Sequence, residues 1–149
     1  MSAFVTAGGG FLLAVLWMDL MFDVQAAKAG EGELPEAVLA STAAYYARVT
    51  TAARPMNRLI ALVMAATLVA LVREAILGTG PGWLPWVSLA LALAPIAMAA
   101  ARTVPSAARL GTRRDPPAVQ SRLAREVLAQ HVFCFVSIAG LVAVQLGWS

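Results

Sequence analysis

Four long runs of apolar residues dominate the chain, and each has nearly the length of a membrane-crossing helix. The runs extend from Ala3 to Phe22, from Met56 to Leu77, from Trp83 to Ala101 and from Val127 to Trp148. A helix needs about 20 mostly apolar residues to cross the ~30 Å hydrocarbon layer of a bilayer. The pattern therefore predicts an all-α integral membrane protein, a four-helix bundle formed as one domain by residues 1–149.

The composition agrees with this prediction. Hydrophobic residues make up 60% of the 149 residues and charged residues only 13%, a balance that soluble domains do not show because they cannot bury so much apolar surface. No Lys or Arg precedes the first run, and no A-x-A-like cleavage site lies between it and the charged segment that follows. We therefore expect a retained span rather than a cleaved signal peptide.

Proline positions predict helices that begin before the second and fourth spans. Pro35 is followed by residues at helical spacing, namely Val38, Leu39, Thr42, Tyr45, Tyr46 and Val49. Pro116 and Pro117 stand where a helix would open and continue into the fourth span. Pro55 either opens the second span or kinks a longer helix, since a proline is tolerated only in the first turn of a straight helix. We expect helical extensions ahead of both spans.

The basic residues indicate how the bundle is oriented. All of them except Arg73 flank the first or the third connection between spans. Lys28, Arg48, Arg54 and Arg58 flank the first, and Arg102, Arg109, Arg113, Arg114, Arg122 and Arg125 flank the third. Because Lys and Arg collect on the cytoplasmic side, both long connections with their helical extensions are predicted to be cytoplasmic, and both termini outside. We expect a multi-pass protein of the bacterial inner (plasma) membrane.

The same topology explains the formal net charge of +3. Basic residues beside membrane spans favour membrane lipids as partners rather than nucleic acid. In the first span, Gly8, Gly9 and Gly10, with Ala14 one turn further on, form a stripe of small residues that lets another helix approach closely. Four short spans make a thin bundle, so we also expect a homo-oligomer or a place in a larger membrane complex.

Five polar residues stand within or beside the spans, where an ionisable group costs roughly 2.5–3.5 kcal/mol. Asp19 and Asp23 lie near the inner end of the first span, and their i, i+4 spacing puts both carboxylates on one helix face. Asn57 and Arg58 open the second span, and His131 lies about one turn inside the fourth. With a rise of ~1.5 Å per residue, Asp19 and His131 reach similar depths in antiparallel helices. The five side chains are therefore predicted to converge on one cytoplasm-facing cavity.

Two interpretations of this convergence remain open. In the first, the residues form a catalytic site, with the two carboxylates as acid/base groups, His131 as general base, and Arg58 with Asn57 orienting a substrate anion. In the second, the acids pair with Arg54, Arg58 or Arg102 and only fix the helix register. His131 is the only histidine, and its titration range suits proton transfer.

A metal ion is a further candidate for this site. Asp19, Asp23 and His131 supply the mixed oxygen and nitrogen ligands that iron or manganese accepts. The chain contains neither a Glu-x-x-His nor a His-Glu-x-x-His motif, which argues against such a site. No other cofactor is indicated. Cys134 is the only cysteine, so no disulfide can form within the chain, and its apolar surroundings predict an unreactive thiol.

The second span begins with Ala53-Arg54-Pro55-Met56-Asn57-Arg58-Leu59-Ile60. With this Pro-x-Asn-Arg motif and four short spans, the chain resembles the anthrone oxygenase-like family of small membrane proteins. The resemblance implies a four-helix bundle and cofactor-independent oxidation of an aromatic compound, with Asn57 as the one residue carried over. The layout is also similar to membrane-associated eicosanoid and glutathione metabolism proteins. Their arginine- and asparagine-containing stretch with its nearby glutamate is absent, which puts glutathione chemistry in doubt.

Three functions remain open. The leading hypothesis is a protein that binds or transforms a small apolar molecule at a cytoplasm-facing polar pocket between the helices. The second is a structural or assembly subunit of a larger membrane complex, which would use the glycine stripe and the basic loops. The third is proton- or ion-coupled transport through Asp19, Asp23 and His131, although only Ser137 and Gln145 extend polar character toward the outer half. Whether the protein is an enzyme is left open.

Overall fold

Helices joined by short connections make up the structure, a computed structural model that describes residues 2–30, 32–78 and 80–148. In chain order they are α1 (Ser2–Lys28), α2 (Glu36–Ala47), the π-helical segment η1 (Arg48–Ala52), α3 (Arg54–Leu77), α4 (Leu84–Met98), the π-helical segment η2 (Ala99–Thr103), α5 (Val104–Thr112) and α6 (Pro117–Gly147). No strand occurs within the described ranges, so the predicted all-α fold is confirmed.

In the part of the chain that the structure describes, four helical stretches are long and apolar enough to cross a membrane. They are Ala3–Lys28, Pro55–Leu77, Leu84–Thr112 and Pro117–Gly147. Each carries one of the four apolar runs of the sequence. Large apolar side chains stand exposed on all four, including Trp17 on α1, Ile76 on α3, Leu93 on α4 and Val136 on α6. Such a surface suits lipid rather than water, and the chain is a multi-pass four-helix bundle.

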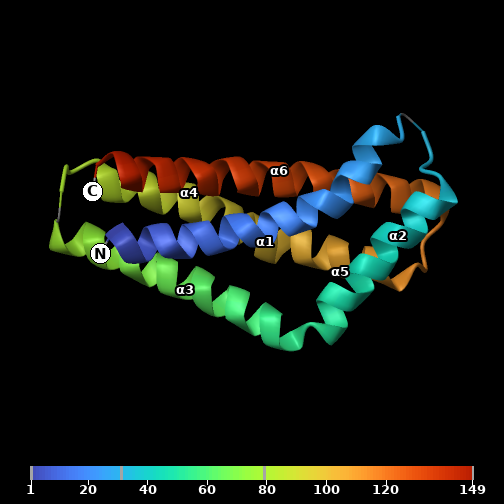
Figure 1. The fold of residues 1–149 in the computed structure, drawn as a ribbon, viewed down its shortest axis with the longest axis horizontal. Helices are drawn as coiled ribbons and strands as arrows, with labels where there is room; N and C mark the ends of the chain where they lie inside the picture. The colour runs from blue at the N-terminus through green and yellow to red at the C-terminus, as the bar shows by residue number, and fades with distance from the viewer. Residues whose placement is uncertain (1, 31, 79, 149) are drawn as a thin grey trace.

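The two ends of the bundle differ. Both chain termini lie at one end, whereas α2, α5 and the start of α6 gather at the other (Figure 1). At the end with the termini, Trp83 and Trp148 meet edge to face with ring centroids 5.0 Å apart, and tryptophans are enriched at membrane–water interfaces. Gln145 Nε2 donates a hydrogen bond to Ser88 Oγ at 3.0 Å. This bond joins α6 to α4.

The helical extensions predicted ahead of the second and fourth spans are present as α2 and the first turns of α6. Two other helices continue further than predicted. α1 runs past Phe22, so Asp23 lies inside a helix. The third membrane helix does not stop at Ala101 but continues through η2 and α5. α5 buries Ala107 and Leu110, and this packing keeps a stretch with polar positions helical.

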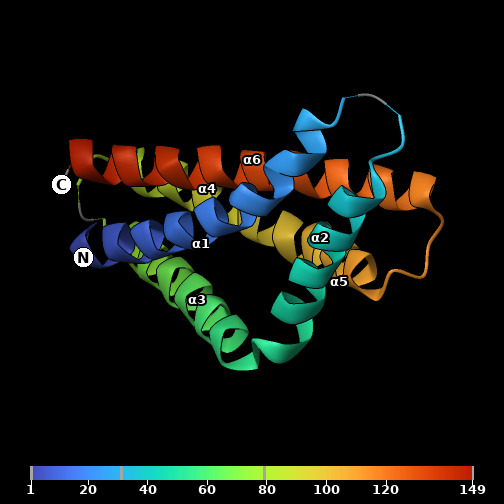
Figure 2. The same ribbon diagram turned by 45° about the vertical axis from the view of Figure 1, so that its right-hand side comes forward.

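Both π-helical segments end shortly before a proline. η1 is followed by Pro55 and η2 by Pro105. A proline ring clashes with the carbonyl one turn earlier, and a wider π turn relieves that clash. After η1 the backbone leaves the helix at Ala53, with φ −85° and ψ 33°, and α2 meets α3 at a sharp angle (Figure 2). Pro55 therefore opens a new helix, whereas the chain after η2 continues helically as α5.

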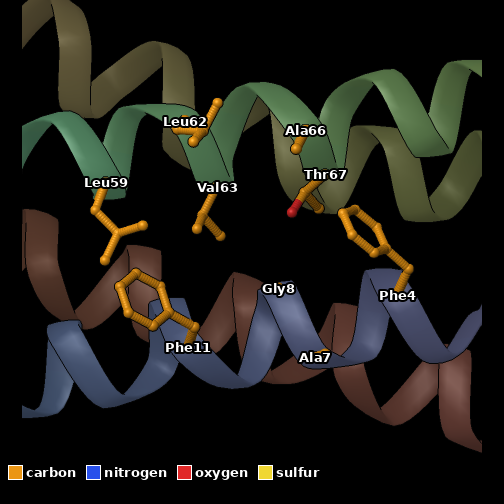
Figure 3. A pocket seen from close by; sticks show the side chains of 9 residues that line it. All are labelled: Phe4, Ala7, Gly8, Phe11, Leu59, Leu62, Val63, Ala66 and Thr67. Carbon is orange, nitrogen blue, oxygen red and sulfur yellow. The ribbon is translucent and has the colours of Figure 1, made fainter.

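The glycines of α1 contact two different helices. A Cβ on Gly8 would lie 2.5 Å from Thr67 Oγ1 of α3, and one on Gly9 would lie 2.6 Å from Val142 Cγ2 of α6. Gly8 and Thr67 face each other across an otherwise apolar groove of about 400 Å³ (Figure 3). Gly10 has no neighbour within 4 Å. Gly8 and Gly9 thus pack helices within the chain, and only Gly10 stays on the exposed surface.

A glycine in α5 lets this helix touch the backbone of α2. A Cβ on Gly111 would lie 2.7 Å from Ala47 N and 3.0 Å from Tyr46 C. The end of α5 is also linked to the start of α2 by an ion pair between Arg113 and Glu36. The close approach at Gly111 therefore sets the position of α2 and of the residues it carries.

We expect Gly111→Ala to lower the free energy of unfolding by about 1–3 kcal/mol, the usual effect of forcing atoms into a packed contact. Gly10→Ala is the matched control, because it adds the same methyl group to a helix at a position with no neighbour within 4 Å. That variant should keep or slightly raise stability, since alanine favours a helix by about 1 kcal/mol over glycine. Thermal unfolding in detergent compares the two. Equal midpoints would contradict the role assigned to Gly111.

Candidate functional site

Three elements far apart in the sequence bring a set of polar side chains together. α1 carries Asp19 and Asp23 on one face, α2 carries Tyr45 and Tyr46, and α6 carries His131. α1 packs along α6, and α2 contacts both helices. Two carboxylates, two phenols and one imidazole therefore meet in a single group of side chains, which we call the carboxylate cluster.

Asp23 lies at the centre of the carboxylate cluster and is only 1% exposed. Tyr46 Oη donates a hydrogen bond to Asp23 Oδ1 at 2.5 Å, and His131 Nδ1 lies 2.6 Å from Asp23 Oδ2. An ionised carboxylate can only accept hydrogen bonds, and short bonds to a charged group are the strong ones. Both oxygens have a partner, as a carboxylate buried in apolar surroundings requires.

Asp19 is the more open of the two carboxylates. Tyr45 Oη donates to Asp19 Oδ1 at 2.6 Å, and the Tyr45 ring stacks on Phe22 with centroids 4.0 Å apart. Asp19 Oδ2 lies 3.9 Å from His131 Nε2, which is beyond hydrogen-bond distance. The Asp19 side chain is 14% exposed, against 1% for Asp23. One oxygen of Asp19 is therefore open to a further donor.

The hydrogen bond to Asp23 orients the imidazole of His131. The carboxylate of Asp23 can only accept a hydrogen bond, so Nδ1 of His131 donates and carries the proton. The other ring nitrogen, Nε2, is the one nearer Asp19. Nε2 accepts a hydrogen bond in the neutral ring and donates one in the protonated ring. The pair of Asp23 and His131 thus has the arrangement of a general acid/base group held by a carboxylate.

A cavity of about 570 Å³ lies beside the carboxylate cluster. Most of its wall is apolar and comes from α1, α3, α4, α5, α6 and both π-helical segments. The polar residues in the wall are Asp19, Tyr46, Thr50, Asn57, Thr103 and His131. Three wall residues are exposed, namely Ala61, Ala100 and Val104. They mark an apolar mouth between α3 and the continuous helix of η2 and α5.

Asn57 and Arg58, predicted to act together, point in different directions. Asn57 lines the cavity, and its Nδ2 donates to the Val49 carbonyl oxygen at 2.7 Å, which ties the start of α3 to η1. Arg58 is exposed and is not part of the cavity wall, because neighbouring residues of a helix point about 100° apart. The structure thus brings the two acids and His131 together, places Asn57 on the wall and leaves Arg58 outside. The exposed position of Arg58 does not suit its predicted role of orienting a substrate anion.

The carboxylates bond to phenols and an imidazole rather than to guanidinium groups. Arg58 and Arg102, offered above as ion-pair partners, are both exposed, and the side chain of Arg54 lies outside the described part of the structure. The depth estimate paired His131 with Asp19, whereas its short contact is with Asp23. Side chains lean toward the N-terminus of their own helix. In antiparallel helices Asp23 and His131 therefore lean toward each other.

The predicted metal ligands have no metal-binding arrangement. Within residues 2–30, 32–78 and 80–148, no group of three or more His, Cys, Asp or Glu side chains is placed so as to hold a metal ion. Asp19, Asp23 and His131 are instead engaged with the two tyrosines and with each other. An iron or manganese centre is therefore not proposed.

Three residues that complete the site were not predicted from the sequence. Tyr45 and Tyr46 were expected only as helical positions of α2, and Thr103 was not considered. A usable signal existed, because buried acids need donors and the chain has only two tyrosines, which stand side by side before the second span. Thr103 gave no such signal. It is 3% exposed and its Oγ1 has no hydrogen-bond partner among the described residues.

Burial, together with the negative carboxylates, raises the pKa of both Tyr45 and Tyr46 above the ordinary value of 10.0. A phenol with a raised pKa in the folded state contributes stability that is present below pH 10 and is lost as the pH rises further. Because no other tyrosine exists, the ultraviolet absorbance of tyrosinate reports on these two alone. We expect little tyrosinate at about pH 10, where an ordinary tyrosine is half ionised.

The tyrosinate signal should instead appear at higher pH, together with loss of helical circular dichroism. Tyr45→Phe and Tyr46→Phe assign the signal to one or the other phenol. Titration of either tyrosine near pH 10 with the helices intact would contradict its bond to the carboxylate.

Comparison of the chain with protein-family models, with curated proteins and with solved structures finds no match. The site combines a buried acid/base pair, a second carboxylate with one free oxygen, and a mainly apolar cavity that opens between membrane helices.

Proposed function

We propose that the protein binds a small, largely apolar molecule in the cavity, with the polar end of that molecule against Asp19 and His131. The observation that carries this proposal is the wall of the cavity, which is apolar over most of its area and includes a few polar side chains, Asp19 and His131 among them. Pockets for small molecules commonly have volumes of about 300–1,000 Å³ and combine apolar walls with a few polar groups. A cavity of about 570 Å³ fits that class.

The buried hydroxyl of Thr103 is evidence for the proposal that the cavity holds a bound molecule. Thr103 lines the cavity and is 3% exposed, yet its Oγ1 has no hydrogen-bond partner among the described residues. Buried polar atoms in folded proteins are nearly always paired. A ligand with a polar group would supply the partner that the neighbouring side chains do not.

The mouth of the cavity supports access from the membrane. Its exposed residues, Ala61, Ala100 and Val104, all lie on helices long and apolar enough to cross a membrane. An apolar molecule dissolved in lipid can enter there without crossing a polar surface. By the distribution of basic residues, the carboxylate cluster lies toward the cytoplasmic side, and the bacterial inner membrane is the proposed location.

The site also suits chemistry on the bound molecule. Asp23 holds the imidazole of His131 by Nδ1, so that Nε2 is the nitrogen able to exchange a proton with a ligand. The resemblance at the start of the second span implies oxidation of an aromatic compound, and Asn57, the residue it carries over, lies on the cavity wall. We extend the proposal to proton abstraction from such a compound by His131.

Transport is less well supported than binding. The helices pack closely beyond the cavity through an apolar core that includes Val5, Leu71, Ala92 and Leu141. The side chains of Gln145 and Ser88 are hydrogen-bonded to each other. Within the described ranges, polar side chains therefore do not continue from the cavity wall through the outer half of the bundle, as a path for ions or protons would require.

Ala99→Phe tests the proposal, because Ala99 is partly buried and lines the cavity. A phenyl group there should exclude the ligand and lower the amount of small molecule that co-purifies with the protein by about tenfold or more. Ala97→Phe is the matched control, since Ala97 is exposed on the same helix and is not part of the wall. Solvent extraction and mass spectrometry of the purified proteins measure the difference. Identical extracts from wild type and both variants would count against the proposed pocket.

A further inference from the structure

We propose that the ligand of the cavity is an apolar amine whose protonated nitrogen binds the carboxylate of Asp19. This inference rests on the proposed function and names the chemical class of its ligand.

The charges around the site do not balance. α1 contributes Asp19 and Asp23, α2 contributes the neutral phenols of Tyr45 and Tyr46, and α6 contributes His131. Among the described residues, no Lys or Arg belongs to the cavity wall. With both acids ionised, the net charge of the site is −1 when the imidazole is protonated and −2 when it is neutral. An uncompensated charge in apolar surroundings is unfavourable, and a cationic ligand would neutralise it.

Several free atoms of the wall can accept a hydrogen bond. Asp19 Oδ2 has no hydrogen bond among the described residues, and its ion-pair contact with His131 Nε2 measures 3.9 Å. Asn57 donates a hydrogen bond from Nδ2 to the Val49 carbonyl oxygen. Its Oδ1 is left to accept a hydrogen bond. Thr103 Oγ1 is buried and unpartnered in the same wall. A group with several N–H donors, such as an ammonium, matches such a set.

Asp19 rather than Asp23 is the carboxylate that can take the amine. Both oxygens of Asp23 are occupied, by Tyr46 and by His131, and its side chain is 1% exposed. Asp19 has one occupied oxygen, a 14% exposed side chain and a place in the cavity wall. Asp23 therefore orients the imidazole, whereas Asp19 is open to the ligand.

Among the described side chains, no arginine offers an anion site in the cavity. Arg58 and Arg102 are exposed and stand outside the wall. An anionic ligand would meet the carboxylate of Asp19 with no described Lys or Arg in the wall to offset it. The proposed ligand is therefore opposite in charge to the substrate anion predicted from the sequence.

Three rigid probes of matched size test the inference: biphenylmethylamine, biphenylmethanol and biphenylcarboxylate. Their binding to the full chain is measured in nanodiscs of zwitterionic phosphatidylcholine, with empty nanodiscs as background. We expect the amine to bind about tenfold or more tightly than the alcohol, as a charged hydrogen bond provides, and the carboxylate to bind most weakly. Asp19→Asn should bring the affinities for amine and alcohol within about twofold to threefold of each other.

Glu126→Gln is the control, because Glu126 is an exposed acid that pairs with Arg122 and lies outside the cavity. It should keep the preference for the amine. Equal binding of amine and alcohol by the wild type, or preference for the carboxylate, would overturn the amine inference and leave the apolar pocket standing. Binding of none of the three probes by the wild type would overturn the proposed function as well. The wild-type comparison decides the matter even if Asp19→Asn fails to fold.

Discussion

The buried carboxylate of Asp23 is the constraint on which the rest of the site depends. An ionised acid inside a membrane bundle needs donors on both oxygens, and here they come from Tyr46 on α2 and His131 on α6. Three elements that are far apart in the sequence must therefore meet at one point. The same contacts that satisfy Asp23 fix the imidazole and leave Asp19 facing the cavity.

The cavity exists because α2 turns back onto the bundle instead of continuing into α3. Pro55 ends the helical run after η1, and Gly111 lets α5 approach the backbone of α2. Tyr46 is thereby carried to the acids, while α3 diverges from α2 (Figure 2). The two π-helical segments line the space between them. Such segments often mark functional positions in helices, and here each one precedes a proline.

Much of the fold follows from residue patterns, and less of the site does. Apolar runs of membrane-spanning length predicted the four helices, and i, i+4 spacing put Asp19 and Asp23 on one face. The depth argument brought them near His131, but it could not show that side-chain tilt favours Asp23. The partnership with Tyr46 and the exposure of Arg58 depend on how α2 and α3 pack, which no local pattern records. The continuation into α5 was missed for the same reason.

Asp23 holds the imidazole of His131 by Nδ1 and leaves Nε2 toward Asp19 in the cavity wall. Because the chain has one histidine, nuclear magnetic resonance of nitrogen-labelled imidazole in lipid bilayers observes this ring alone. We predict a protonated Nδ1 with a strongly deshielded, slowly exchanging proton that is lost in Asp23→Asn. A neutral ring protonated at Nε2, or an Nδ1 proton that exchanges rapidly with water, would contradict it.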